Sequence, residues 1–126
     1  RNYVITPDII ASGGQGDIFV GKCFKSNQPV AIKCCVLDTE IAKMAYDDEK
    51  NALKYISSNA GVVDLIDCFE ENDIGFFVME LAEIDLLDYY IHKNPSESDL
   101  QKLLLSLAFA VKSLHMNGVA HLDLKP

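Results

Sequence analysis

The first 36 residues alternate between apolar stretches and short polar turns. Residues 3–11, 17–24 and 28–36 are rich in the branched and aromatic side chains that strands favour. The sequences SGGQG and KSNQ join these stretches and are typical of tight turns. The pattern therefore predicts a meander of three strands.

From Asp38 onwards, the apolar period changes from that of a strand to that of a helix. Five residues follow at helical spacing and would share one face: Ile41, Ala45, Glu49, Ala52 and Ile56. Four are apolar and one is an acid, and a carboxylate on a packing face is costly unless a cation pairs with it. We therefore expect either a cation opposite Glu49 or a helix rotated so that Glu49 lies at the solvent edge.

Two further strands and a short helix are predicted next. Residues 62–69 and 74–81 are apolar and are separated by the polar turn EEND. A short helix is expected over residues 85–93 and should end before Pro95, because proline disfavours helical geometry in the preceding residue.

A longer helix should close the chain. Its expected start is a capping box formed by Ser98 and Gln101, and its expected end is Gly118. Leu105 and Phe109 widen its apolar stripe almost all round. We therefore expect this helix to need burial on several sides.

Composition and charge narrow the class of protein. The chain has 126 residues, 49% of them hydrophobic, which is enough for one domain with a real core. Its formal net charge of −8 argues against a surface for nucleic acid or anionic membranes. There is no apolar run of spanning length, and residues 1–8 lack a signal-peptide core. We expect an intracellular protein that binds neither nucleic acid nor membranes.

The four cysteines do not suggest a metal site or a disulfide framework. They form no C-x-x-C pair and have no histidine at zinc-ligand spacing. We expect reduced packing residues at Cys23, Cys34, Cys35 and Cys68, and no metal site.

The glycine-rich turn is a first candidate for chemistry. Ala11, Gly13 and Gly16 form an A-x-G-x-x-G pattern, and Ile18 follows where it could cover an enclosed ligand. Glycines between two strands either make a tight hairpin or let backbone N–H groups approach an anion. Taken alone, the turn is more simply interpreted as a hairpin without a ligand.

The sequence V-A-I-K provides a second candidate. In a strand, Ala31 and Lys33 would point to one face and Val30 and Ile32 to the other. A single lysine in a strand is usually solvated, but Lys33 is the obvious cation for Glu49 on the following helix.

The last six residues, HLDLKP, provide a third candidate. Asp123 could accept a hydroxyl proton, Lys125 would add a positive charge beside it, and His121 is interpreted as a structural hydrogen-bonding residue. In isolation H-x-D-x-K occurs by chance. His92 and His115 are expected to be helix-end or core residues.

The order of these motifs resembles that of a eukaryotic protein kinase domain of the Ser/Thr type. The resemblance covers essentially the whole chain and about half of the family's domain. It implies an α+β fold in which residues 1–81 form the small lobe, a five-stranded antiparallel sheet with one long helix. Residues 82–126 would form the hinge and the start of the α-helical large lobe, ending inside the catalytic loop.

The resemblance also implies an ATP site. The loop over the phosphates would comprise Ala11, Ser12, Gly13, Gly14, Gln15 and Gly16. Ile18 and Ala31 would enclose the adenine, and Lys33 would hold the α- and β-phosphates and pair with Glu49. Met79 would be the gatekeeper and Glu80 to Ala82 the hinge, with Asp85 approaching the ribose.

For catalysis, the resemblance implies that Asp123 orients the hydroxyl of a protein substrate and that Lys125 neutralises the transferred phosphoryl group. The chain stops before the catalytic-loop asparagine and the D-F-G aspartate. We therefore expect the Mg²⁺-holding residues in the missing segment and expect this polypeptide alone not to be a competent kinase.

Two departures from the family pattern keep alternatives open. Ala11 replaces the first glycine, and Leu122 replaces the arginine of H-R-D, which normally holds a phosphorylated activation loop. A pseudokinase or truncated nucleotide-binding scaffold is the main alternative. A small-molecule phosphotransferase is less favoured because of the L-K-P ending. The uncovered apolar helix further suggests self-association or a covering partner.

Overall fold

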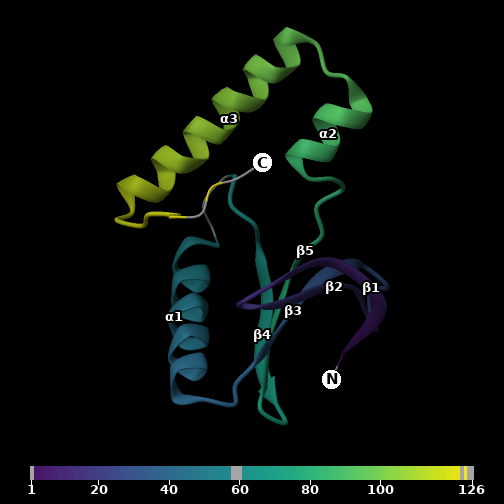
Figure 1. Ribbon diagram of the computed structural model, residues 1–126, viewed down its shortest axis with the longest axis vertical. Helices are drawn as coiled ribbons and strands as arrows, with labels where there is room; N and C mark the ends of the chain where they lie inside the picture. Colours follow the sequence, from purple (N-terminus) through teal and green to yellow (C-terminus); the bar gives the residue numbers. More distant parts are fainter. Residues whose placement is uncertain (1, 58–60, 123, 125–126) are drawn as a thin grey trace. The chain divides into compact units, whose positions relative to one another are not determined.

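The computed structural model describes residues 2–57, 61–122 and 124 (Figure 1). The chain divides into two compact units, Arg1–Tyr55 with Val63–Leu81, and Ile56–Val62 with Ala82–Pro126. Among the described residues, no helix combines the length and the apolar character that crossing a membrane requires.

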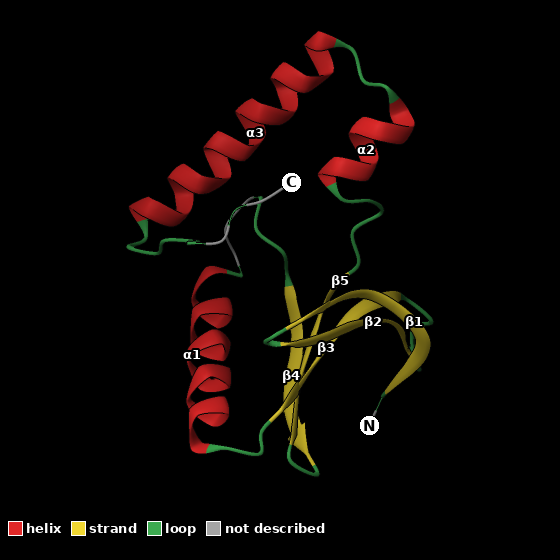
Figure 2. Cartoon of the chain, in the orientation of Figure 1, coloured by secondary structure: helices red, strands yellow, loops and turns green. Residues whose placement is uncertain are grey.

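The first unit consists of an antiparallel sheet with one long helix (Figure 2). Its elements are β1 (Tyr3–Gly13), β2 (Gly16–Cys23), β3 (Pro29–Val36), α1 (Glu40–Ile56), β4 (Leu65–Glu71) and β5 (Ile74–Glu80). The strands lie in the order β1-β2-β3-β5-β4, and every neighbouring pair is antiparallel. The α+β class and the five-stranded sheet expected from the sequence are confirmed.

Two strands differ from the sequence prediction by two or more residues at a boundary. β1 runs on to Gly13, so the glycine-rich turn is reduced to Gly14 and Gln15. β4 begins at Leu65 instead of residue 62 and extends into the predicted turn. The β4–β5 connection is therefore only Asn72 and Asp73, both with positive φ (52° and 58°), as tight two-residue hairpins require.

The sheet has a core on each face. On one face, Val30, Ile32 and Val78 form a buried cluster with Phe69 and Phe76 packed against it. On the other face, beneath α1, the buried residues are Cys35, Leu37, Tyr46 and Phe77. This division follows the alternation of β3, because successive side chains of a strand point to opposite faces.

The face that α1 turns to the sheet is only partly the predicted one. Ile56 is buried as expected, but Ile41 is 80% exposed and Ala45 and Ala52 are also exposed, whereas Tyr46 is only 3% exposed. The prediction was wrong at these three positions because the apolar spacing does not weigh side-chain size. Burying a tyrosine ring removes far more apolar area from water than burying an alanine, so the helix rotates toward Tyr46 and the half-buried Leu53.

The second unit contains α2 (Leu86–Lys93) and α3 (Glu97–Met116). Asp85 caps α2, since its Oδ1 accepts a hydrogen bond from the Asp88 backbone N–H at 2.7 Å. α2 ends at Asn94, whose φ of 43° is left-handed, and Pro95 follows as expected.

The capping box predicted for α3 at Ser98 and Gln101 was wrong. The box is formed two residues earlier, where Ser96 Oγ accepts from the Asp99 backbone N–H at 3.2 Å and Asp99 Oδ2 accepts from the Ser96 N–H at 3.3 Å. A carboxylate at this position also interacts favourably with the positive end of the helix dipole, which the Gln101 amide cannot do.

The end of α3 is as predicted, and its apolar surface is uncovered, as the sequence also suggested. Gly118 stops the helix with a φ of 73°, and its N–H donates to the His115 carbonyl at 3.0 Å. Leu114 is buried, but Leu105 and Phe109 remain 60% and 67% exposed. Much of the apolar surface of α3 is therefore uncovered.

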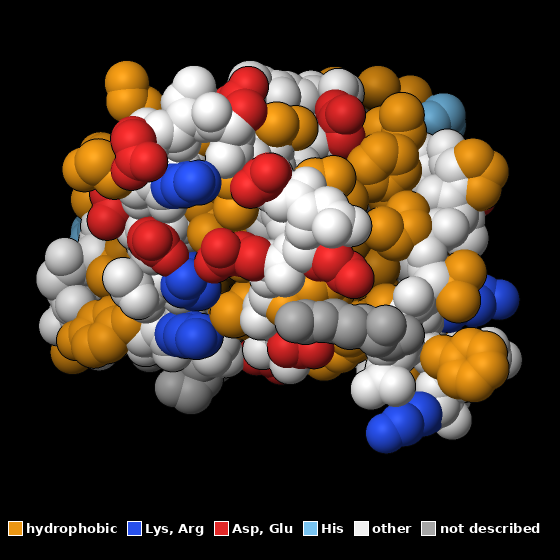
Figure 3. Space-filling model, turned by 90° about the horizontal axis from the view of Figure 1, so that it is seen from below, with side chains coloured by type: hydrophobic (Ala, Val, Ile, Leu, Met, Phe, Trp, Pro, Cys, Tyr) orange, Lys and Arg blue, Asp and Glu red, His pale blue; other side chains and the backbone are white. Residues whose placement is uncertain are grey.

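Figure 3 shows a face on which acidic side chains lie among basic and hydrophobic ones. One of the described ion pairs joins Lys50 Nζ of α1 to Glu70 Oε1 of β4 at 3.5 Å, and Lys50 also pairs with Asp47. Solvent-exposed ion pairs contribute only about 0–1 kcal/mol each. The fold therefore depends chiefly on its two apolar clusters.

Candidate functional site

The candidate site lies on one face of the first unit, where β2, β3 and β5 are adjacent. Ala31 and Lys33 of β3 share this face because they are two residues apart. Ile18 of β2 lies opposite Lys33, and Met79 of β5 lies opposite Ala31. Directly opposed residues in an antiparallel pair point to the same side, so the register brings these four side chains together.

Lys33 and Glu49 form a charge pair between β3 and α1. Lys33 Nζ donates to Glu49 Oε1 at 2.7 Å and to Oε2 at 2.8 Å. The side chain of Lys33 is 11% exposed and that of Glu49 is 31% exposed. An ammonium group buried this deeply needs a partner, and Glu49 supplies it from the edge of the helix. The pair leaves the third ammonium hydrogen of Lys33 for another acceptor.

The glycine-rich turn joins β1 to β2 beside this pair. Gly16 has a φ of 127°, and a Cβ there would overlap the Cys34 carbonyl oxygen, so only glycine lets the turn lie this close to β3. A Cβ at Gly13 or Gly14 would meet nothing within 4 Å, so the tip is open. Ser12 Oγ donates to Asp17 Oδ1 across the hairpin.

A groove lies beneath the turn within the first unit. It is lined by residues 13–17, by Cys34 to Val36 of β3, and by α1 residues that include Ile41, Ala45 and Glu49. Its volume is about 970 Å³. Ile41 and Ala45 therefore line this groove, whereas the sequence prediction placed them in the core.

At the end of β5, Met79 is half-buried and Glu80 is exposed. The Glu80 backbone N–H donates to the Asp64 carbonyl at 3.1 Å, and Glu80 Oε1 accepts from the Asp64 N–H at 3.1 Å. The Glu80 backbone N–H is therefore already used, and its side chain holds the segment before β4.

The remaining predicted residues belong to the second unit or lie outside the described residues. Ala82 belongs to the second unit and is exposed, and Asp85 of the same unit is engaged as the N-cap of α2. Asp123 and Lys125 lie outside the described residues. Next to Asp123, Leu122 is 94% exposed with a φ of 62°.

Two residues of the site were missed in the sequence. Phe77 is fully buried opposite Lys33, whose Nζ lies 6.0 Å from the centre of the ring, and the Tyr46 ring packs on Phe77 at 4.7 Å. The signal for Tyr46 was its position three residues before Glu49, which places both on neighbouring parts of one helix face.

The thiols and acids of the site show no sign of metal binding. Among the residues that the structure describes, no three His, Cys, Asp or Glu side chains gather as metal ligands. The four cysteines are free, and burial raises the pKa values of the Cys34 and Cys35 thiols above their ordinary range. These two thiols therefore stay protonated and act as packing groups.

Together these features suit a ligand with an apolar part and an anionic part. Ile18, Ala31 and Met79 offer an apolar surface, while Lys33 offers a buried positive charge beside a glycine turn with an open tip. A flat base with a polyphosphate has both properties.

Comparison with known proteins agrees with this geometry. The family model of the protein kinase domain matches residues 5–126. The chain is 31% identical over 130 residues to "Probable serine/threonine-protein kinase fhkB" of Dictyostelium discoideum, with 100% of this chain and 11% of that protein covered.

Two other relatives are similar at the same level. "Calcium/calmodulin-dependent protein kinase type 1" of Caenorhabditis elegans is 29% identical over 94% of this chain, and "Serine/threonine-protein kinase mos" of Patiria pectinifera is 30% identical over 94%. The chain spans 35% of the length of each of these two proteins. Since the family model spans nearly the whole sequence, the chain belongs to the protein kinase family.

Proposed function

We propose that this chain is the nucleotide-binding portion of an ATP-dependent Ser/Thr protein kinase. Such an enzyme transfers the γ-phosphoryl group of ATP to a hydroxyl group of a protein substrate. The observation that carries the proposal is the pair between the buried Lys33 ammonium group and Glu49, beside the glycine-rich turn. An intracellular setting, where ATP is available, is part of the proposal.

The resemblance to the protein kinase family assigns roles in ATP binding to individual residues. Ile18 and Ala31 would enclose the adenine, with Met79 as the gatekeeper and the backbone from Glu80 to Ala82 meeting the adenine edge. Lys33 would hold the α- and β-phosphates with the Nζ hydrogen that Glu49 leaves over. Residues 11–16 would cover the phosphates, and Asp85, although occupied as a helix cap, would be the ribose neighbour.

The phosphoryl-transfer residues form the second part of the proposal. Asp123 would accept the proton of the substrate hydroxyl, and Lys125 would neutralise the transferred group. Mg²⁺ would supply charge neutralisation at the phosphates, and its ligands are expected in the catalytic-loop and D-F-G segments. We also propose that the apolar surface of α3 is covered by another copy or by a partner.

The contribution of Lys33 can be measured directly through nucleotide binding. In Lys33→Met, we expect the affinity for ATP with Mg²⁺ to fall about 10- to 100-fold, because a charge-assisted hydrogen bond to phosphate is lost. Lys22→Met is the matched control, since Lys22 is exposed on β2. Equal affinities of Lys33→Met and the wild type in a calorimetric titration would contradict the nucleotide site.

The contribution of Asp123 requires a phosphorylation assay with the whole protein that carries this sequence. Asp123→Asn should keep ATP affinity and lose phosphoryl transfer to a protein substrate, because the amide cannot accept the hydroxyl proton. Undiminished transfer by this variant would exclude Asp123 as the base.

A pseudokinase is the second candidate, and Leu122 favours it. This residue stands where the family has the arginine of H-R-D. A titration with ATP in the presence and absence of Mg²⁺ separates the two functions. The kinase should bind ATP more tightly with Mg²⁺, and a scaffold should bind weakly or independently of the metal.

A further inference from the structure

Tyr46 lies on α1 three residues before Glu49, and its side chain is almost completely buried at 3% exposure. Residues three apart on a helix are neighbours on its surface. A movement of α1 against the sheet at Tyr46 therefore also moves the Cα of Glu49.

The Tyr46 side chain contacts the sheet in three ways. Its hydroxyl group donates to the Phe69 carbonyl of β4 at 3.1 Å, and its ring packs on Phe77 of β5 at 4.7 Å. The ring also fills the space above Gly75, where an added Cβ would overlap it. Tyr46 thus helps to set both the distance of α1 from the sheet and its rotation.

Phe77 connects this contact to the charge pair. Its ring centre lies 4.7 Å from that of Tyr46 and 6.0 Å from Lys33 Nζ. Lys33 in turn holds Glu49, which belongs to the same helix as Tyr46. The contacts form a closed loop from α1 through β5 and β3 back to α1.

Lys50, the residue after Glu49, supports the same placement. Its Nζ lies 5.0 Å from the centre of the Tyr46 ring and 3.5 Å from Glu70 Oε1 of β4. The ion pair between Lys50 and Glu70 is therefore a second, more exposed contact between α1 and β4.

We propose that Tyr46 is a positioning residue, which holds α1 in the orientation from which Glu49 reaches Lys33, and that Gly75 provides the space it needs. The proposal rests on the proposed function, because it assigns the placement of Glu49 a role in nucleotide binding. In this proposal, Tyr46 acts through Glu49 and not on the reacting atoms.

The test measures the affinity of the whole protein for a fluorescent ATP analogue with Mg²⁺ in single and double variants. Tyr46→Phe keeps the ring and loses the bond to Phe69, and Gly75→Ala pushes the ring outward. We expect each variant to bind the analogue about 3- to 10-fold more weakly. Tyr55→Phe is the matched control, since Tyr55 lies on the same helix and is 62% exposed.

A double-mutant cycle with Glu49→Gln separates positioning from a general loss of stability. If Tyr46 acts through Glu49, Tyr46→Phe should have almost no further effect on affinity in the Glu49→Gln background, although it still lowers the melting temperature. An equal loss of affinity in both backgrounds would overturn the inference. Where Gly75→Ala fails to fold, the Tyr46→Phe cycle alone decides.

The inference and the proposed function fail in different ways. If Lys33→Met weakens binding of the analogue but Tyr46→Phe does not, the inference is overturned and the nucleotide site stands. If Lys33→Met also leaves the affinity unchanged, the nucleotide site itself is wrong.

Discussion

At the scale of single residues, the environment of Tyr46 leads to a pH dependence. Burial, followed by the nearby Cys68, Glu70, Cys35 and Asp47, raises the pKa of the Tyr46 phenol above its ordinary value of 10.0. The neutral phenol is therefore favoured in the folded state and remains a hydrogen-bond donor to Phe69 at neutral and mildly alkaline pH.

The raised pKa predicts a loss of stability in alkali. Above about pH 10, the unfolded chain releases the phenol proton and the folded chain keeps it, so the free energy of unfolding falls as pH rises. The fall can reach about 1.4 kcal/mol per pH unit. Urea unfolding from pH 8 to 11.5 should therefore show a steeper decline for the wild type than for Tyr46→Phe. If the free energy of unfolding fell equally with pH in the wild type and in Tyr46→Phe, Tyr46 would not be the cause of the decline. Tyr55→Phe is the control and should behave like the wild type.

The pKa shifts of the cysteine thiols likewise predict that these thiols differ in reactivity. Hydrogen bonds from the side chain and backbone of Ser26 lower the pKa of Cys23, while burial raises the pKa values of Cys34 and Cys35. Since the thiolate is the reacting species, iodoacetamide at pH 7.5 should alkylate Cys23 before the other two. Peptide mass mapping over time measures the order, and Ser26→Ala should slow Cys23 alone.

At the scale of elements, the start of α3 gives a direct comparison between the sequence prediction and the structure. Ser96→Ala should lower the free energy of unfolding by about 1 kcal/mol, because the Asp99 N–H loses its acceptor. Ser98→Ala should change it little, since Ser98 is exposed within the first turn. Chemical denaturation of both variants measures this difference. A larger loss of stability in Ser98→Ala than in Ser96→Ala would instead support the cap that the sequence predicted at Ser98.

The order and type of the elements were predictable because they depend on local patterns. The strand alternation of V-A-I-K places Lys33 on the helix side of the sheet, and the single acid on the face of α1 points to its partner. Gly118 marks a helix end through a left-handed conformation that other residues rarely adopt, and Pro95 marks one because proline disfavours helical geometry in the preceding residue.

Other features depend on contacts between distant residues and were not predictable. The rotation of α1 follows from the space above Gly75, which lies 29 positions after Tyr46 in the sequence and leaves no periodic signal. The bridging position of Phe77 likewise requires the register of β3 and β5. Spacing along one element cannot show which large side chain fits a gap in another.

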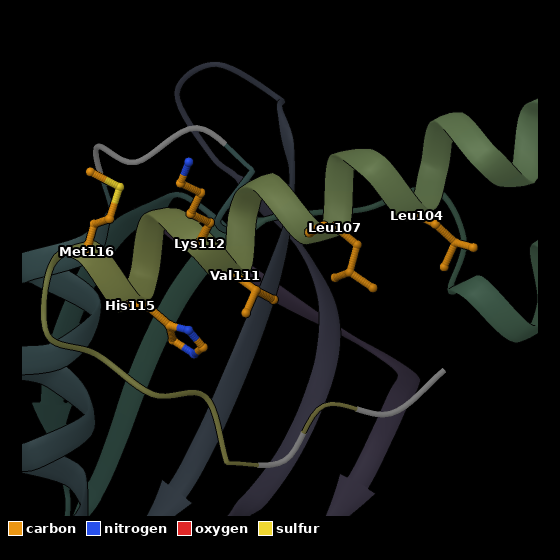
Figure 4. Close-up of a pocket in the computed structure, with 7 residues that line it drawn as sticks. Leu104, Leu107, Val111, Lys112, His115 and Met116 are labelled. Carbon is orange, nitrogen blue, oxygen red and sulfur yellow. The ribbon is translucent and has the colours of Figure 1, made fainter.

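At the scale of the whole molecule, the uncovered surface of α3 is the dominant feature. Figure 4 shows Leu104, Leu107, Val111 and His115 pointing to one side of the helix, where with three other residues they line a shallow pocket. Leu105, Phe109 and Met116 are also exposed, so apolar groups meet water around much of the helix. Contiguous apolar surface of this kind is typical of a surface that another chain or segment covers.

The exposed surface predicts that this 126-residue chain self-associates. Phe109→Glu places a charge in the middle of the apolar surface, at a side chain that is 67% exposed, and should shift sedimentation equilibrium toward the monomer. Gln101→Glu adds the same charge at an exposed polar position of the same helix and should leave association unchanged. The fold of the first unit should survive both changes, because α3 lies outside its apolar clusters.

A wild-type chain that stays monomeric at tens of micromolar would show that this surface does not drive self-association. Equal dissociation by both variants would assign the effect to net charge instead of apolar contact.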